Sequence, residues 1–189
     1  WRKHTFYDLY KKAYMPWDWQ PRLQKLAHSL GLIFISTPFD PTAVDFLEKL
    51  KVPAYKIASY ECIDIPLLKY IAKTKKPVIM SVGFASLKEI EFSVKTLRAY
   101  GTKDLAILYC LTSYSDAGKP GYTNMSTMLD LSRRFNCIVG FSDNMGGMDI
   151  PALAAASGAS IIEKHLIDKH TPRALDDRFS LDMHEFKTM

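Results

Sequence analysis

Long hydrophobic runs are absent from this 189-residue sequence, and none approaches the roughly 20 apolar residues of a membrane-spanning helix. No secretory leader pattern is visible either, so we expect no association with a membrane. Cysteine is scarce, and Cys62, Cys110 and Cys137 form neither a CxxC pair nor a disulfide-like pattern. We interpret them as buried thiols of a reduced, cytoplasmic protein, with a single reactive cysteine as the alternative.

Charge of one sign is not concentrated anywhere in the sequence. Lysine and arginine number 25 against 20 aspartate and glutamate residues, which gives a net charge of +5 with neutral histidines. The charges are scattered, with no basic run and no stripe of interleaved aromatic and basic residues. This distribution argues against nucleic-acid binding and fits a small anionic substrate better, with an ordinary solvated surface as the alternative role for most of the lysines.

The sequence does contain a unit that occurs six times: a short apolar strand, a polar residue at its C-terminal end, and a helix. The predicted strands are 31–37, 54–59, 77–82, 105–110, 137–142 and 160–165. Their nearly continuous apolar character is typical of parallel strands covered on both faces. The polar residues at the strand ends are Thr37, Lys56, Ser59, Ser81, Ser142, Lys164 and His165. In a barrel or a doubly wound enzyme, this edge of the sheet bears the catalytic groups.

The number of units predicts an incomplete (β/α)8 TIM barrel of the α/β class. Six units are two fewer than a closed barrel needs. Helices expected over 5–14 and 21–30 have no strand before them, and Trp1 is not an initiator methionine. We therefore expect residues 1–189 to form one barrel domain whose first strands precede Trp1.

The motif KIASYE places a lysine, a serine and a glutamate at the end of the second predicted strand. Lys56 faces the barrel mouth if its neighbours Tyr55 and Ile57 pack against helices. A fixed ammonium group there can neutralise a carboxylate or a phosphate. A surface salt bridge is the alternative role for this lysine.

Three other strand ends have features that suit ligand binding. Ser81 and Ser142 lie close to glycines, where exposed hydroxyl and amide groups suit phosphate, and strand-end capping is the alternative. In the last strand, Glu163 and His165 alternate with Lys164 and therefore face the same side. His165 is a candidate metal ligand, with a structural histidine as the alternative.

Seven segments, in order, resemble the sialic acid synthase family, most closely its pseudaminic acid synthase branch. They are LYKKAYMPWDWQ (9–20), STPFDPTAVDFLEKL (36–50), PAYKIASYECIDIPLL (53–68), KPVIMSVGFASLKEI (76–90), GFSDNMGG (140–147), GASIIEKHLID (158–168) and DDRFSLDMHEFKTM (176–189). The elements KIAS-x-E, GxSD and EKH are specific in this order and spacing. The PWDWQ and FSLDMHEFK elements point to the pseudaminic branch.

The resemblance implies a (β/α)8 barrel followed by a small antifreeze-like domain, which this chain would lack. It also implies that phosphoenolpyruvate condenses with an N-acetylated amino sugar, with the help of a divalent metal. The products would be phosphate and a nine-carbon 2-keto acid of the pseudaminic acid type. For the full-length protein, the resemblance implies a homodimer.

The resemblance also implies roles for individual residues, taken position by position. The residues expected to bind substrate are Lys56, Ser59, Ser81, Thr112 and Ser142. The residues expected to position the sugar and protons are Glu61, Tyr114 and Asp176, with a solvated loop carboxylate as the alternative for Asp176. His165 matches a metal ligand of the family.

The chain departs from the family pattern at the metal site. Asn144 replaces a second metal-binding histidine, and Gln20, Val82 and Ser115 replace other usual residues. His165, Asn144 and water could still hold Mg²⁺ or Mn²⁺, which accept oxygen ligands.

Two rival functions remain open at this point. One is a diverged, non-catalytic barrel that binds phosphoenolpyruvate or a sugar. The other is an aldolase that forms a Schiff base at Lys56 or Lys164.

Overall fold

Five parallel strands form one sheet in the computed structural model, which describes residues 5–112, 123–171 and 176–189. The strands are β1 (Tyr55–Ile57), β2 (Val78–Val82), β3 (Leu105–Cys110), β4 (Ile138–Asp143) and β5 (Ile161–Lys164). Each strand pairs in parallel with the next one along the chain. The order in the sheet therefore follows the order in the sequence, as in a barrel wound in one direction.

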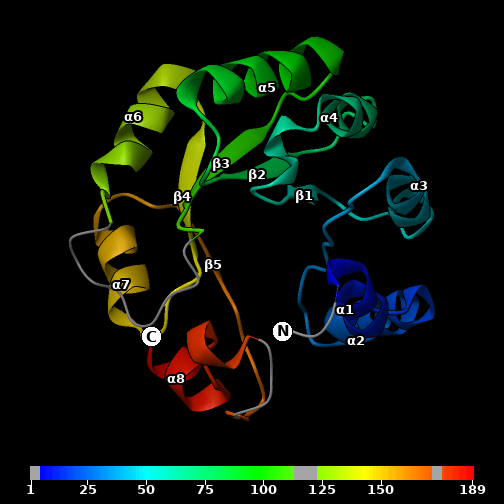
Figure 1. Cartoon of the computed structure of the whole chain (residues 1–189), viewed down its shortest axis with the longest axis vertical. Helices are drawn as coiled ribbons and strands as arrows, with labels where there is room; N and C mark the ends of the chain where they lie inside the picture. The colour runs from blue at the N-terminus through cyan, green and yellow to red at the C-terminus, as the bar shows by residue number, and fades with distance from the viewer. Residues whose placement is uncertain (1–4, 113–122, 172–175) are drawn as a thin grey trace.

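Helices precede the sheet and connect its strands. Within the described residues they are α1 (Phe6–Ala13), α2 (Gln20–Ser29), α3 (Pro41–Lys49), α4 (Ile65–Ala72), α5 (Leu87–Tyr100), α6 (Ser126–Phe135), α7 (Asp149–Ala156) and α8 (Met183–Thr188). Helices α4 to α7 form an arc outside the strands, so the sheet is one half of a barrel (Figure 1). Of the helices described, none is long and apolar enough to cross a membrane.

The helix ends follow from local sequence signals. Ser86 caps α5 and forms a reciprocal capping box with Glu89, as the sequence predicts. Gly101 closes the same helix with a φ of 127°, a value that favours glycine. Asp40 caps α3 by accepting hydrogen bonds from the amides of Thr42 and Ala43. These caps fix where each helix meets the strand beside it.

Side chains on the two faces of the sheet have different partners. The outward-facing ones pack against the helices in the main core: Tyr55, Ile57, Val78, Met80, Ile107, Val139 and Phe141. The register aligns the inward-facing ones in layers, the last of which contains Cys110, Ser142 and Glu163. Because side chains alternate along a strand, the polar groups of this last inner layer coexist with a mainly apolar outer face.

The segment 31–37, predicted as the first strand, forms no strand in the structure. Its side chains Leu32 and Ile33 are 59% and 79% exposed. A parallel strand forms only when its backbone groups pair with those of a neighbour. The adjacent strand in sequence is the short β1, which pairs only with β2 among the described residues. The prediction of a strand over 31–37 is therefore wrong within the described residues, because an apolar segment that pairs with no neighbouring strand there does not form a strand.

Candidate active site

Lys56 points to the inner face of the half-barrel. Its neighbours Tyr55 and Ile57 are fully buried on the opposite face, and the Tyr55 hydroxyl donates to Glu48 on α3 at 2.7 Å. This is the condition under which the sequence places Lys56 inward. The Lys56 side chain is only 11% exposed, so its ammonium group lies in a site with little solvent screening.

The closest partner of Lys56 is Glu163 on the far strand of the sheet. The Lys56 Nζ atom lies 3.2 Å from Glu163 Oε1, and the Ser142 hydroxyl donates to the same oxygen at 2.6 Å. In a flat sheet β1 and β5 would lie about 19 Å apart, at roughly 4.8 Å per strand. The sheet therefore curls until its two edges face each other across the interior. Alternation along EKH predicts that Glu163 faces the same side as His165, but not its contact with Lys56, because only the curvature of the sheet brings Glu163 and Lys56 together.

Two buried hydroxyl groups at the C-terminal ends of the neighbouring strands β1 and β2 have no hydrogen-bond partner among the described residues. They belong to Ser59 and Ser81, which are 7% and 1% exposed. A Cβ atom on Gly83 would lie 3.0 Å from Ser59 Oγ and 2.7 Å from Thr112 Cγ2, so only glycine fits between them. A buried hydroxyl without a partner is costly unless a ligand supplies one. The arrangement suits an anionic ligand that accepts hydrogen bonds.

Glu61 lies beyond β1, in a short 3-10 helix over Glu61–Ile63. Burial raises the pKa of its carboxyl group, with nearby Asp64 acting in the same direction and Lys56 opposing. A carboxyl group with a raised pKa is easier to protonate near neutral pH, which suits a proton donor or acceptor.

His165 follows β5 and lies beside Asp176. The His165 Nδ1 atom is 3.5 Å from Asp176 Oδ2, and the imidazole ring meets Phe179 edge-on at 4.9 Å. Burial lowers the pKa of His165, while Asp176 and Glu163 oppose that shift. A neutral imidazole is the form that binds a metal. The structure thus brings the candidate ligand His165 together with Asp176, which the resemblance implies positions the sugar and protons.

Asn144 lies directly after β4 and is 5% exposed. Its amide nitrogen donates to the Leu111 carbonyl at 3.0 Å and contacts Cys110 Sγ at 3.4 Å. The amide oxygen is then the atom that could face an ion. Amide oxygens, imidazoles and carboxylates are donor types that Mn²⁺ and Mg²⁺ accept, and Asn144 after β4, His165 after β5 and Asp176 beside His165 offer one of each.

The family of the chain follows from the match of its whole length. The model of the NeuB family covers residues 1–189. The chain belongs to the NeuB family. This agrees with the resemblance seen in the KIAS-x-E, GxSD and EKH motifs.

Characterised NeuB-family relatives share a third or more of the residues. The pseudaminic acid synthase of Helicobacter pylori is 38% identical over 189 residues, which is 100% of this chain and 55% of that protein. The N,N'-diacetyllegionaminic acid synthase of Legionella pneumophila is 34% identical over 190 residues, which is 98% of this chain and 52% of that protein. The chain thus spans about half the length of the curated relatives it matches.

A solved structure shows the same architecture. It is an N-acetylneuraminic acid synthetase from Leptospira borgpetersenii, in complex with citrate. The TM-score is 0.89 at 31% identity, over 96% of this chain and 62% of the other. Three different sugar acids thus appear in the names of these relatives, so family membership alone does not select one.

Lys164, in the EKH motif of this NeuB-family chain, lies on the outer face of the sheet. Its Nζ atom is 2.7 Å from Asp143 Oδ2, and both side chains are almost fully buried. The same ammonium group donates to the Met145 carbonyl oxygen. This placement argues against Lys164 as a Schiff-base nucleophile, because the group faces away from Lys56 and Glu163.

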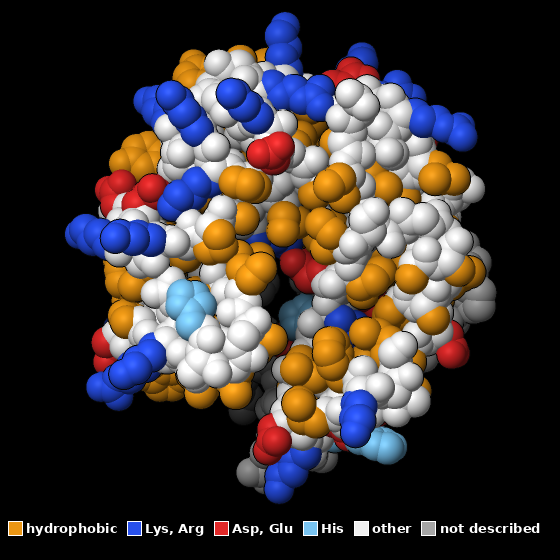
Figure 2. All heavy atoms as spheres, turned by 180° about the vertical axis from the view of Figure 1, so that it is seen from behind, with side chains coloured by type: hydrophobic (Ala, Val, Ile, Leu, Met, Phe, Trp, Pro, Cys, Tyr) orange, Lys and Arg blue, Asp and Glu red, His pale blue; other side chains and the backbone are white. Residues whose placement is uncertain are grey.

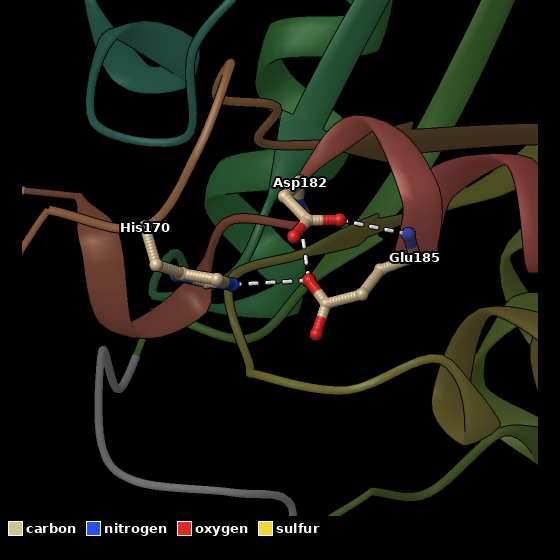
Figure 3. Close-up of side chains that lie close together, drawn as sticks. All are labelled: His170, Asp182 and Glu185. Atoms are coloured by element: carbon tan, nitrogen blue, oxygen red, sulfur yellow. Dashed lines mark hydrogen bonds and ion pairs between the residues drawn. The ribbon is translucent and has the colours of Figure 1, made fainter.

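A second group of possible metal ligands lies near the C-terminal end of the chain, apart from His165 and Asn144. His170, Asp182 and Glu185 bring one ligand atom each to within 4.8 Å of one another (Figure 3). Asp182 and Glu185 also form the capping box of α8, which explains their positions without an ion. The sequence analysis missed this group, although the D-x-x-E spacing of a capping box was visible.

The remaining predicted residues have different outcomes. Tyr114 lies outside the described residues.

Cys62 and Cys110 are buried and Cys137 is half-buried. Burial raises the pKa of all three thiols, and it raises that of Cys62 to about 11. Thiols of this kind react poorly at neutral pH, which favours the structural interpretation of the cysteines.

The surface around the inner face is hollowed. Figure 2 shows a depression near the middle of one face, with acidic, basic and histidine side chains at its walls and hydrophobic ones at its rim. A separate cavity of about 560 Å³ lies at the opposite end of the strands, between residues such as Pro77, Asp104 and Asn136. That cavity contains none of the predicted site residues, so we place the candidate active site on the polar inner face.

Proposed function

We propose that this chain carries the substrate site of a synthase that condenses phosphoenolpyruvate with an N-acetylated amino sugar. The products are phosphate and a nine-carbon 2-keto acid, of the pseudaminic acid type. The similarity to a pseudaminic acid synthase supports this choice of sugar acid. The observation that carries the proposal is the pair of buried hydroxyls of Ser59 and Ser81, which have no hydrogen-bond partner among the described residues and lie at the C-terminal ends of β1, the strand of Lys56, and of its neighbour β2.

The inner face would bind phosphoenolpyruvate through charge and hydrogen bonds together. Lys56 offsets negative charge in a poorly screened site, and the Ser59, Ser81 and Ser142 hydroxyls donate to phosphate or carboxylate oxygens. Thr112 lies against Gly83 and lines the same space. Binding would therefore satisfy the two hydroxyls that have no partner in the described residues.

In the proposed reaction, a bond forms between C3 of phosphoenolpyruvate and the aldehyde carbon of the open-chain sugar. Water then adds at C2, and the bond between C2 and the phosphate oxygen breaks. Glu61, Tyr114 and Asp176 would position the sugar and transfer the protons that the new hydroxyl and the added water require. Much of the rate would come from holding two substrates in the reactive orientation.

His165 and Asn144 would hold a divalent ion, Mn²⁺ or Mg²⁺. When bound, such an ion supplies Lewis-acid polarisation of the sugar aldehyde. Asp176 would orient the His165 ring through its contact with Nδ1. We further propose that the full-length protein works in the cytoplasm as a homodimer.

A second candidate function follows from Asn144. An amide oxygen is a weaker ligand than an imidazole for most transition metals. A barrel that binds phosphoenolpyruvate without turning it over is therefore the alternative to a synthase.

Phosphate release by the full-length protein tests the proposal. The assay combines phosphoenolpyruvate with a series of N-acetylated amino sugars, each with Mn²⁺ or Mg²⁺. We expect phosphate release that depends on both the sugar and the metal. Binding of phosphoenolpyruvate without release under all conditions would support the non-catalytic alternative. A covalent adduct with pyruvate, trapped by borohydride, would support a Schiff-base aldolase instead.

A further inference from the structure

Glu163 lies where an anionic group of a ligand would lie. One of its carboxylate oxygens contacts both Lys56 and Ser142, at 3.2 and 2.6 Å. These are two of the groups through which phosphoenolpyruvate would bind. In the structure, then, a carboxylate of the protein itself engages the candidate anion site.

The burial of the two partners differs in an informative way. The Lys56 side chain is 11% exposed, whereas that of Glu163 is 39% exposed. The ammonium group is thus fixed in the wall, and the carboxylate can move toward solvent. Glu163 is also the only carboxylate that pairs with Lys56 within the described ranges.

A second anion cannot join this arrangement without a cost. A phosphate or carboxylate bound to Lys56 would lie within a few ångströms of Glu163, and like charges at that distance repel strongly where solvent screening is weak. A hydroxyl group such as that of Ser142 has one proton to donate, so it serves one acceptor at a time. The incoming anion must therefore displace Glu163.

We propose that Glu163 is an internal competitor of the substrate, which occupies Lys56 and Ser142 in the empty site and leaves when an anion binds. The inference rests on the proposed function, because it takes Lys56 and Ser142 as substrate contacts. Glu163 then keeps both groups ordered in the empty site and weakens the binding of every anion that enters.

The competition makes Glu163 a specificity-determining residue. A small anion with one acidic group must displace the carboxylate with few contacts of its own. A ligand with both a phosphate and a carboxylate can also engage Ser59 and Ser81, so it displaces Glu163 more easily. The returning carboxylate would in turn favour the departure of inorganic phosphate.

Calorimetric titration of Glu163→Gln in the full-length protein tests this inference. Glutamine keeps the shape of the side chain and removes its charge. We expect phosphoenolpyruvate to bind about tenfold more tightly, a change typical of one charged hydrogen bond. The affinity for inorganic phosphate should rise by a larger factor than the affinity for phosphoenolpyruvate. The ratio of the two affinities should therefore become smaller.

Two further variants complete the design. Glu91→Gln removes the same charge from the exposed surface of α5, where Glu91 lies 3.9 Å from Arg134, and should leave both affinities unchanged. Glu163→Asp keeps the charge but shortens the reach toward Lys56, so an intermediate gain is expected. Circular dichroism establishes that each variant is folded.

If folded Glu163→Gln binds anions no more tightly than the wild type does, the inference is overturned. Glu163 would then have a structural role, in which it holds the Lys56 side chain in place. If that variant does not fold, Glu163→Asp decides in the same way. A wild-type protein that does not bind phosphoenolpyruvate would contradict the proposed function instead. In that case, the comparison of inorganic phosphate binding still decides the role of Glu163.

Discussion

The candidate metal ligands of the proposed site are His165 and Asn144, which directly follow β5 and β4. Partial burial lowers the pKa of His165, which favours the neutral imidazole. Asn144 is buried after β4, and its amide nitrogen is occupied by Leu111 and Cys110. The imidazole of His165 suits transition metals, whereas the amide oxygen of Asn144 suits hard cations.

Replacing Asn144 by histidine should strengthen the binding of Mn²⁺ and change that of Mg²⁺ less. Imidazole is the better donor to transition metals, and we expect a gain of about ten- to a hundredfold, the usual sensitivity of metal shells. Titration of both ions into the wild type and Asn144→His, with phosphoenolpyruvate present, measures this. Equal Mn²⁺ affinities would show that residue 144 does not face the ion.

Single residues also show what the sequence could and could not predict. Alternation along β1 is enough to place Lys56 inward, because Tyr55 and Ile57 need the apolar side. The contact of Lys56 with Glu163 could not be predicted from the sequence, because it depends on the curvature of the whole sheet. The Ser59 hydroxyl, which is buried without a hydrogen-bond partner in the described part of the chain, likewise reflects packing and not local sequence.

At the scale of elements, β4 and β5 are joined by a buried ion pair. Asp143 and Lys164 lie opposite each other in the register, and the same aspartate accepts the amide proton of Met145. Lys164 also donates to the Met145 carbonyl oxygen. The pair therefore fixes the backbone on both sides of Asn144.

Breaking this pair should destabilise the protein strongly. Lys164→Met leaves the Asp143 carboxylate buried without a cation, and we expect the free energy of unfolding to fall by about 3–5 kcal/mol. The double variant Asp143→Leu with Lys164→Met should recover most of that loss, because no charge remains buried. Urea unfolding measures both. Equal losses in the single and double variants would contradict this account of the pair.

The last helix depends on a cluster of charges that responds to pH. His170 Nε2 contacts Glu185 Oε2 at 3.1 Å, and His170 Nδ1 contacts Asp177 at 3.3 Å. The hydrogen bond with Glu185 is the main cause that raises the pKa of His170. The backbone amide of Asp182 is the main cause that lowers the pKa of Glu185.

Helix α8 should therefore be held most firmly in mildly acidic solution. The contribution of His170 is complete below its unfolded pKa of about 6.5 and is lost as the pH rises through its higher folded pKa. The contribution of Glu185 is present above its unfolded pKa of about 4.3 and is lost as the pH falls through its lower folded pKa. Amide exchange protection of α8 should be greatest between these limits.

Two histidine variants control this measurement. His170→Ala should remove the loss of protection at high pH. His28→Ala, on the exposed surface of α2, should keep it. An unchanged pH dependence in His170→Ala would contradict the assignment.

On the scale of the whole molecule, the half-barrel leaves apolar surface open beside β1. The segment before β1 exposes Leu30, Leu32, Ile33 and Phe39, each by more than half. Its sequence predicted a strand, and the five later units formed as predicted because each has a neighbour with which to pair. A repeated pattern thus indicates the fold class, while the completion of each unit depends on its partners.

The curvature of the sheet brings the ends of distant strands together into one site. It brings Lys56 of β1 within 3.2 Å of Glu163 of β5, across the width of the half-barrel. The buried hydroxyls of Ser59 and Ser81 lie at the C-terminal ends of β1 and of its direct neighbour β2. The central claim is that this inner face binds phosphoenolpyruvate through Lys56.

Calorimetric titration of phosphoenolpyruvate into full-length wild type, Lys56→Ala and the control Lys95→Ala tests that claim most directly. Lys95 is exposed on α5, so its removal lowers the net charge by the same amount at a distance from the site. The account predicts that folded Lys56→Ala binds at least about tenfold more weakly, as expected for the loss of a charged contact, and that Lys95→Ala binds as the wild type does. An unchanged affinity in folded Lys56→Ala would contradict the account.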